Sequence, residues 1–129
     1  MEPRGIEIRE AHYPGRAPID AFGNGGFRFA DMSHRGSLMC LPSGIYGWQP
    51  SDPQNPSADD LRRVFDEAGE IEILLAGMGA DLRRLRPELA RSLREAGIVA
   101  DAMSTGAAVR TYNVLVAEDR AVAAFFIAV

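Results

Sequence analysis

A chain of 129 residues with 47% hydrophobic and 25% charged residues has the size and composition of one globular domain, and we expect a single domain over residues 1–129. Its net charge of −4 argues against a nucleic-acid partner, because non-specific binding to nucleic acid needs a basic surface. All 14 basic residues are arginine, which excludes chemistry that depends on lysine, such as Schiff-base formation or a P-loop.

Targeting signals are not evident in the sequence. Residues 1–10 alternate in charge and lack the apolar segment of a secretory signal. The one cysteine, Cys40, excludes a disulfide within the chain and fits a reducing compartment. The longest apolar run, residues 121–129, is too short to cross a membrane and is typical of a buried strand. We therefore expect a cytoplasmic protein that does not insert into membranes.

The first half of the chain has the alternation and the turns of β-structure. Ile6 and Ile8 alternate with charged residues, as in a half-buried strand. Asn24 and Gly25 favour a tight hairpin turn, because this pair accepts positive φ. Further strands are expected over residues 19–22, 27–29, 37–41 and 45–48, and the apolar run 37–41 should be the most buried.

Helices and strands alternate in the second half, after a loop with three prolines over residues 49–57. Ser57 and Asp60 resemble a capping box at the start of a helix, and Pro87 is suited to the first position of the next one. Helices are expected over residues 57–69, 87–97 and 104–117, and strands over residues 71–76, 98–103 and 121–129.

This order of elements predicts a three-layer α/β fold. Strands that alternate with helices form a mostly parallel central sheet with helices on both sides, here preceded by an N-terminal β-rich portion. The strands that end at Ala76 and Met103 should be parallel and joined by a right-handed crossover.

The candidate site lies in two loops that follow these two strands. In an open α/β sheet, ligands bind at the carboxyl ends of the strands. Glycines in the first loop allow close approach to the backbone, while a helix N-terminus and an arginine on the same face in the second loop favour an anion. The predicted anion pocket consists of Gly77, Met78, Gly79, Ser104, Thr105, Gly106 and Arg110.

A simpler interpretation of these loops remains open. The glycines then only form turns, Ser104 only caps the helix, and Arg110 pairs with a carboxylate such as Asp81 or Asp101. A Rossmann dinucleotide site is disfavoured, because Leu82 stands where its fingerprint needs a glycine.

Nucleophilic and metal chemistry find little support. Asp31, Ser33 and His34 are too close in sequence to form a triad, and no nucleophile-elbow motif is present. Cys40 lies in an apolar run and is expected to be a buried, inert thiol. Two isolated histidines and one cysteine do not form a metal-ligand pattern, so we expect no cofactor.

Two surface features have alternative interpretations. Tyr46 and Trp48 either form an exposed aromatic patch for a partner or cover an edge of the sheet. The arginine cluster either contacts phosphate groups or forms a solvated helix face with its preceding loop, balanced by Glu88 and Glu95, and we favour the solvated face. The cluster consists of Arg83, Arg84, Arg86, Arg91 and Arg94.

Four motifs together resemble the Mth938-like domain family, a domain of unknown function. The similarity covers residues 6–129, and the motif over residues 103–113 is its most specific part. The motifs are IDAFGNGGFRF at 19–29, LPSGIYGW at 41–48, LAGMG at 75–79 and MSTGAAVRTYN at 103–113.

The resemblance implies a three-layer α/β fold with a mixed central sheet whose last strand is antiparallel to the others. The family includes a mitochondrial assembly factor for respiratory complex I and a cytosolic vertebrate protein linked to adipocyte differentiation, and its bacterial members are mostly uncharacterised. It has no established set of catalytic residues. The resemblance therefore implies a bacterial, non-enzymatic assembly or interaction factor with a protein partner, such as a respiratory complex subunit.

Two other functions compete with this one. The first is a binding protein for a small anionic ligand at the predicted pocket, and the second is an enzyme of unknown type. The enzyme ranks last, because the sequence contains no recognisable acid–base pair or activated nucleophile.

Overall fold

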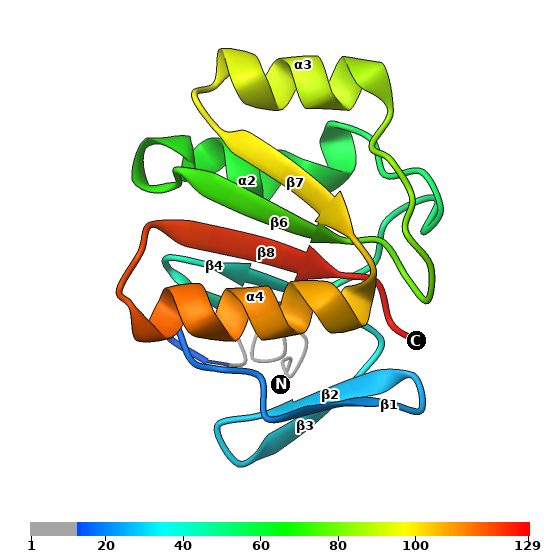
Figure 1. Cartoon of the computed structure of the whole chain (residues 1–129), viewed down its shortest axis with the longest axis vertical. Helices are drawn as coiled ribbons and strands as arrows, with labels where there is room; N and C mark the ends of the chain where they lie inside the picture. Colours follow the sequence, from blue (N-terminus) through cyan, green and yellow to red (C-terminus); the bar gives the residue numbers. More distant parts are fainter. Residues whose placement is uncertain (1–12) are drawn as a thin grey trace, which may run out of the picture.

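The computed structural model describes residues 13–129, so the strand expected around Ile6 and Ile8 lies outside the described residues. Figure 1 shows the arrangement of the elements. The strands are β1 (Ala21–Gly23), β2 (Gly26–Phe29), β3 (Met32–Arg35), β4 (Ser37–Leu41), β5 (Gly44–Trp48), β6 (Ile73–Gly77), β7 (Val99–Met103) and β8 (Val122–Phe126). The helices are α2 (Arg62–Asp66), α3 (Pro87–Glu95) and α4 (Thr105–Ala117), with short 3₁₀ turns η2 (Asp59–Leu61) and η3 (Ala68–Glu70).

The main sheet has five strands in the order β5-β4-β8-β6-β7. β6 pairs in parallel with both β7 and β8, which confirms the predicted parallel pair that ends at Ala76 and Met103. β4 is antiparallel to β5 and to β8. The sheet is therefore mixed and mostly parallel, as expected.

The expectation that the last strand is antiparallel to the others is wrong. β8 runs parallel to β6, and the antiparallel strand of the sheet is β4. The reason is the connection: α4 carries the chain from β7 to β8 as a helical crossover, and such crossovers join parallel strands. β4 instead continues into β5 through a short turn, which joins antiparallel neighbours.

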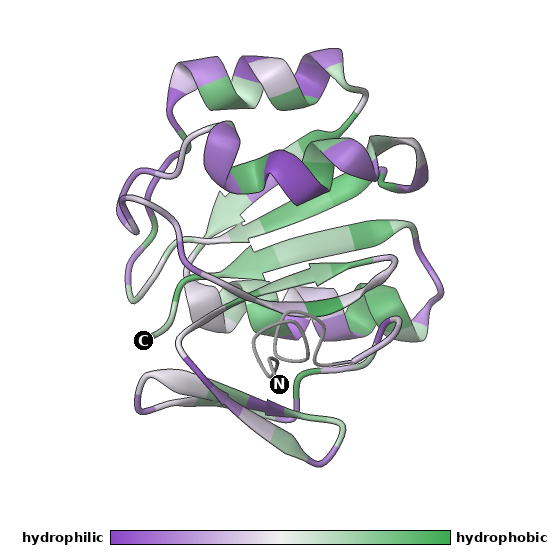
Figure 2. Ribbon diagram, turned by 180° about the vertical axis from the view of Figure 1, so that it is seen from behind, coloured by the Kyte–Doolittle hydropathy of each residue, from purple (hydrophilic) through white to green (hydrophobic). Residues whose placement is uncertain are grey.

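Helices cover both faces of the main sheet (Figures 1 and 2). α4 lies on one face, and α2 lies on the other. Tyr112 of α4 and Phe126 of β8 belong to the buried cluster on the α4 side, whereas Leu61, Leu93 and Phe125 belong to the cluster on the α2 and α3 side. Because β8 is buried on both faces, its five residues are all apolar.

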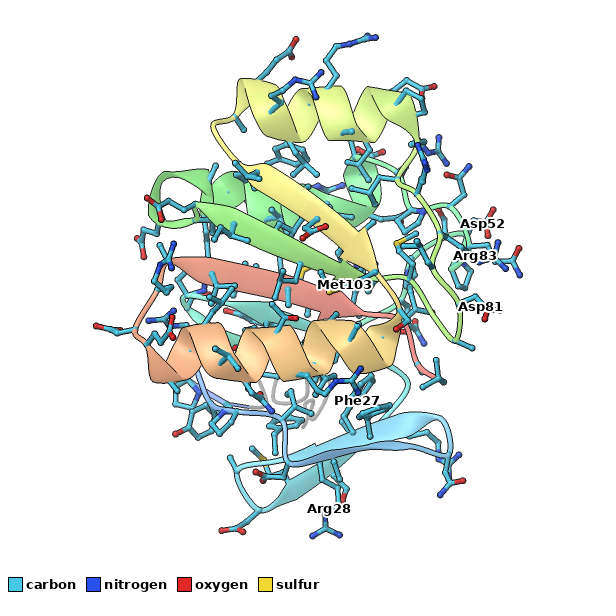
Figure 3. The ribbon with its side chains drawn as sticks, viewed as in Figure 1. Phe27, Arg28, Asp52, Asp81, Arg83 and Met103 are labelled. Carbon is cyan, nitrogen blue, oxygen red and sulfur yellow. The ribbon has the colours of Figure 1, made fainter. Side chains whose placement is uncertain are left out.

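The N-terminal β-rich portion forms a separate small sheet in the order β1-β2-β3. Its first turn contains Asn24 and Gly25 with φ of 53° and 79°, as the Asn-Gly pair predicted. Phe27 points from this sheet toward the body of the molecule, and Arg28 points away from it (Figure 3). The small sheet therefore adds its apolar face to the core beside α4.

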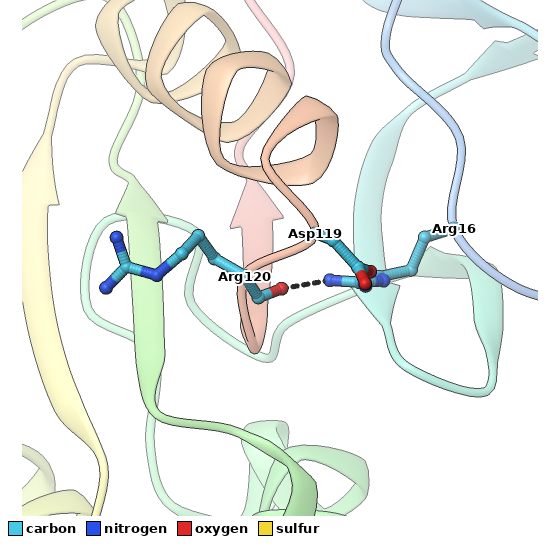
Figure 4. Close-up of polar contacts among 3 residues, drawn as sticks. All are labelled: Arg16, Asp119 and Arg120. Atoms are coloured by element: carbon cyan, nitrogen blue, oxygen red, sulfur yellow. Dashed lines mark hydrogen bonds and ion pairs between the residues drawn. The ribbon is translucent and has the colours of Figure 1, made fainter.

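β1 begins two residues later than the expected strand over residues 19–22, because a side chain holds Ile19 instead. Asn113 of α4 accepts a hydrogen bond from Ile19 N at 2.8 Å and donates one to Ile19 O at 2.9 Å. Arg16 extends this attachment: it contacts Asp119 at 2.9 Å and donates to the carbonyl of Arg120 (Figure 4). The segment before β1 is thus fixed along α4 and the turn after it.

The first predicted helix, over residues 57–69, is shorter than expected and is split into η2, α2 and η3. Its predicted capping pair is present: Asp60 accepts hydrogen bonds from Ser57 N at 2.9 Å and from Ser51 N at 3.0 Å. Partial burial would raise the pKa of Asp60, but these hydrogen bonds and those from the two serine hydroxyls hold it below its ordinary value.

We expect Asp60→Asn to destabilise the protein by about 1 kcal/mol at neutral pH, because the cap loses its charged acceptor. The pKa of Asp60 is lower in the folded state, so its contribution is complete above the unfolded value of about 3.9 and disappears as the pH falls through the folded value. Urea unfolding of both proteins across this range measures the difference. The exposed Asp59→Asn is the control, and a difference that does not shrink in acid would contradict the assignment.

Candidate functional site

The structure brings the two predicted loops together at the carboxyl ends of β6 and β7. Thr105 N donates to Gly79 O at 2.8 Å, and Gly79 N donates to the Thr105 hydroxyl at 3.0 Å. The same hydroxyl donates to Ile127 O at 2.7 Å. Thr105 is fully buried, so it links the two loops to the end of β8 rather than facing solvent.

The helix N-terminus of α4 is largely satisfied within the protein. Ser104 is the N-cap, and its hydroxyl accepts a hydrogen bond from Ala107 N at 3.3 Å. With Thr105 N bonded to Gly79, the N–H of Gly106 is the donor in this turn with no partner among the described residues. The predicted anion pocket thus retains fewer free donors than its sequence suggested.

Arg110 lies on the face of α4 that the helical spacing predicted. A Cβ placed on Gly106 would lie 3.6 Å from a guanidinium nitrogen of Arg110 and 3.1 Å from the ring of Phe22. Arg110 is exposed, and within residues 13–129 it forms no ion pair with Asp81 or Asp101. Sequence reasoning missed Phe22, because this side chain reaches the site from the distant hairpin of β1 and β2.

The two glycines of the first loop have different roles. Gly77 is the last residue of β6, and a Cβ there would lie 3.1 Å from both Phe125 O and the Phe126 ring. Its small size therefore permits close packing of the sheet against α4 rather than access for a ligand. Gly79 has φ of 110°, which favours glycine, and Met78 between them is buried.

The residues that suggested a serine hydrolase do not converge. Ser33 and His34 are adjacent in β3, so their side chains point to opposite faces of the strand. His34 Nε2 lies 3.0 Å from the carbonyl oxygen of Ser37, to which it can donate. Asp31 lies in the turn before β3, with φ of 62°. These three side chains do not form a triad.

Cys40 is buried in β4, as expected, beside Tyr112 of α4. Burial raises the pKa of the Cys40 thiol to about 12, so the thiol is protonated at neutral pH. Burial also raises the pKa of Tyr112 well above its ordinary value. The Tyr112 hydroxyl has no strong hydrogen-bond partner among the described residues. Its polar neighbour is the Cys40 thiol, which is only a weak hydrogen-bond partner.

We expect Tyr112→Phe to be neutral or to stabilise the protein by up to about 1 kcal/mol, because it removes a buried hydroxyl that lacks a good partner. Chemical denaturation measures the change. A loss of stability larger than about 1 kcal/mol would show that the hydroxyl makes a substantial interaction.

The two aromatic residues of β5 pack against the protein. The ring centre of Trp48 lies 4.7 Å from that of Phe125 in a tilted arrangement, and its indole N–H donates to Asp60 O at 2.8 Å. The guanidinium of Arg63 lies 4.4 Å from the ring centre of Tyr46. Both side chains are partly buried and pack against the apolar cluster on the α2 and α3 side, so they do not form an exposed aromatic patch.

The arginine cluster lies in α3 and in the loop before it. Arg86 donates to the Asn55 side chain at 3.1 Å and to its carbonyl at 2.7 Å, whereas Arg84 and Arg94 are exposed. In Figure 3 Arg83 and Asp81 extend outward from this loop. Within residues 13–129, no group of three or more His, Cys, Asp or Glu is placed to hold a metal ion.

The features above define an α/β protein with a mixed five-stranded sheet and two hydrogen-bonded loops at the carboxyl ends of its strands. Residues 19–127 match the family described as "Protein of unknown function (DUF498/DUF598)". The chain belongs to this family.

Two relatives set the range of the similarity. An uncharacterised protein of Rhodobacter capsulatus is 40% identical over 90% of this chain and 88% of its own length. NADH dehydrogenase (ubiquinone) 1 alpha subcomplex assembly factor 3 of Mus musculus is 25% identical over 95% of this chain. The match spans 66% of the mouse protein's length.

Solved structures agree with the fold. A crystal structure of a Bartonella henselae protein, described as an outer membrane protein, has 62% identity and a TM-score of 0.87, and covers 91% of this chain and 98% of its own. A Mth938-like domain from Bordetella pertussis has 23% identity and a TM-score of 0.74, and covers 98% of this chain and 89% of its own. The Mth938-like fold is thereby confirmed. No helix in residues 13–129 has both the length and the apolar character needed to cross a bilayer.

Proposed function

We propose that this chain is a non-enzymatic assembly factor that acts by binding other proteins, and that its client is a respiratory NADH dehydrogenase. The observation that carries the proposal is the similarity to the mouse assembly factor, which extends over 95% of this chain. The same proposal assigns the protein to the bacterial cytoplasm. The reducing conditions of that compartment suit the free thiol of its single cysteine, Cys40.

The geometry of the strand ends argues against a catalytic role at this place. The Gly79 N–H and the Thr105 hydroxyl bond to each other, the same hydroxyl donates to Ile127 O, and the Ser104 hydroxyl accepts from Ala107 N. Groups engaged in this way stabilise the fold and are not aimed at a common point where a reacting atom would lie.

A deletion strain tests the proposal. Removal of the gene should reduce the amount of assembled NADH dehydrogenase on a native gel and leave partial complexes, and the wild-type gene should restore it. NADH dehydrogenase at the normal level and size in the deletion strain would contradict the proposed function.

A second candidate function is the binding of a small anion near Arg110. The guanidinium of Arg110 and the N–H of Gly106 share one surface and have no partners among the described residues. A thermal-shift screen of phosphate and small carboxylates should then stabilise the wild type and not Arg110→Ala. Equal responses of both proteins would exclude this function.

A further inference from the structure

We propose that the open edge of β7, together with the groove between β7 and α3, binds an extended acidic segment of a partner protein as an added strand of the main sheet. The inference rests on the proposed function, for which it names a binding surface and the chemistry of the partner. Strand addition of this kind uses backbone hydrogen bonds for affinity and side-chain contacts for specificity.

β7 has one paired side and one open side. It lies at the end of the strand order, and β6 is its partner. Val99 N donates to Glu72 O at 2.9 Å, and Met103 O accepts from Met78 N at 2.8 Å. The backbone groups of Val99 and Met103 therefore point toward the β6 side. Alternate residues of a strand direct their backbone groups to opposite sides, so Ala100 and Ala102 direct theirs to the open side.

The opposite edge of the sheet, β5, is partly covered. Ile45 N of β5 donates to Tyr13 O at 2.9 Å, so Tyr13 pairs with part of that edge. A Cβ on Gly44 would lie only 2.5 Å from Tyr13 O, which shows how closely the Tyr13 backbone approaches. Within residues 13–129, no segment pairs in this way with the open side of β7. An unpaired edge is a template for another strand.

A groove of about 320 Å³ lies beside this edge. In Figure 1, α3 lies next to β7, with no further strand beyond it. The lining combines the small side chains of the strand with apolar and basic side chains of α3 and of the loop before it. The lining residues that matter here are Arg84, Leu85, Arg94, Ala100 and Ala102.

Charge complementarity selects an acidic occupant. Arg84 and Arg94 are exposed, line the groove, and form no ion pair within the described residues. Ala100 and Ala102 face α3, so an added strand would present every second side chain to the two arginines. Carboxylates at those positions would pair with the guanidinium groups.

The other face of β7 prefers apolar side chains. On that face the Val99 side chain is 68% exposed and can pack against an apolar side chain of the partner segment. Asp101 on the same face would repel an acidic side chain of that segment. The surface thus fits a segment in which acidic and apolar residues alternate. A second copy of this chain fits poorly, because a two-fold pairing of β7 edges places the arginine-bearing faces of both copies side by side.

The direct test is an NMR titration of the purified full chain with a blocked peptide of alternating glutamate and valine. The amide signals of Ala100 and Ala102 should shift, and their hydrogen exchange should slow. The counterpart with lysine in place of glutamate should have no such effect. Equal responses to both peptides, shifts confined to other elements, or no shift at all would overturn the proposal.

Two variants sharpen this test. The double charge reversal Arg84→Glu with Arg94→Glu should weaken peptide binding by about tenfold or more without disturbing the fold, since both side chains are exposed. Arg28→Glu with Arg120→Glu is the matched control, because it makes the same charge change at exposed positions outside the groove. Similar losses of peptide affinity in both double variants would show that net charge alone causes the effect, and would overturn the proposal.

Cellular experiments separate this inference from the proposed function. A photo-cross-linking residue at Val99 should capture an acidic extended segment, whereas one at the similarly exposed Val114 of α4 should not. Capture of a basic segment or of a second copy of this chain at position 99 would overturn the proposed binding of an acidic segment. If deletion lowers assembled NADH dehydrogenase and the Arg84/Arg94 variant fully restores it, the groove fails while the assembly function holds. If deletion has no effect but Val99 captures an acidic segment, the groove holds while the assembly function fails.

Discussion

Thr105→Val should destabilise the protein by about 2–4 kcal/mol, although the two side chains have nearly the same shape. The substitution leaves a buried Gly79 N–H and the Ile127 carbonyl without the hydroxyl that now bonds to both. An unpaired buried polar group costs about 1–3 kcal/mol, and here there are two of them. Urea denaturation monitored by circular dichroism measures the change.

Thr111→Val is the matched control for this prediction. The Thr111 hydroxyl donates to Ala107 O at 2.9 Å within the same helix, and its removal should cost less than about 0.5 kcal/mol. Thr105→Ser keeps the hydroxyl and should recover much of the stability. A Thr105→Val protein as stable as Thr111→Val would show that the two loops do not depend on this link.

Phe126→Ala should cost about 3–5 kcal/mol, a large fraction of the stability of a small domain. Phe126 is fully buried in β8, with its ring 5.8 Å from that of Phe27 and 5.7 Å from that of Tyr112. It therefore joins the main sheet, the small sheet and α4. Truncation would leave a cavity where these three elements meet.

Phe22→Ala removes the same number of atoms at a position that is 40% exposed, and should cost about 1 kcal/mol. If Phe126→Ala does not fold, Phe126→Leu should still fold, with a smaller loss of stability because it removes fewer atoms. Equal costs at Phe126 and Phe22 would contradict the packing described here.

Local patterns in the sequence were sufficient to predict those turns and helix ends that depend only on neighbouring residues. The positive φ of Asn24 and Gly25, the cap at Ser104 and the helix start at Pro87 all follow from neighbouring residues. The parallel pairing of β6 and β7 followed from their helical connection. The helical connection through α4 likewise predicts that β8 is parallel to β6, as the structure shows. The antiparallel last strand that the family resemblance implied was wrong.

Features that depend on distant segments could not be predicted. The Thr105 hydroxyl bonds to Ile127, and the ring of Phe22 lies over Gly106, but no local pattern relates these positions. The splitting of the first helix around Arg62 also has no clear signal in the sequence. For these reasons the anion pocket was predicted with more free donors than the folded chain offers.

The most direct test of the proposed assembly function is affinity purification of the tagged protein from its native host, in gentle detergent and with quantitative mass spectrometry. We expect reproducible enrichment of NADH dehydrogenase subunits over a tag-only control. A preparation with no enriched NADH dehydrogenase subunit would contradict the assembly function.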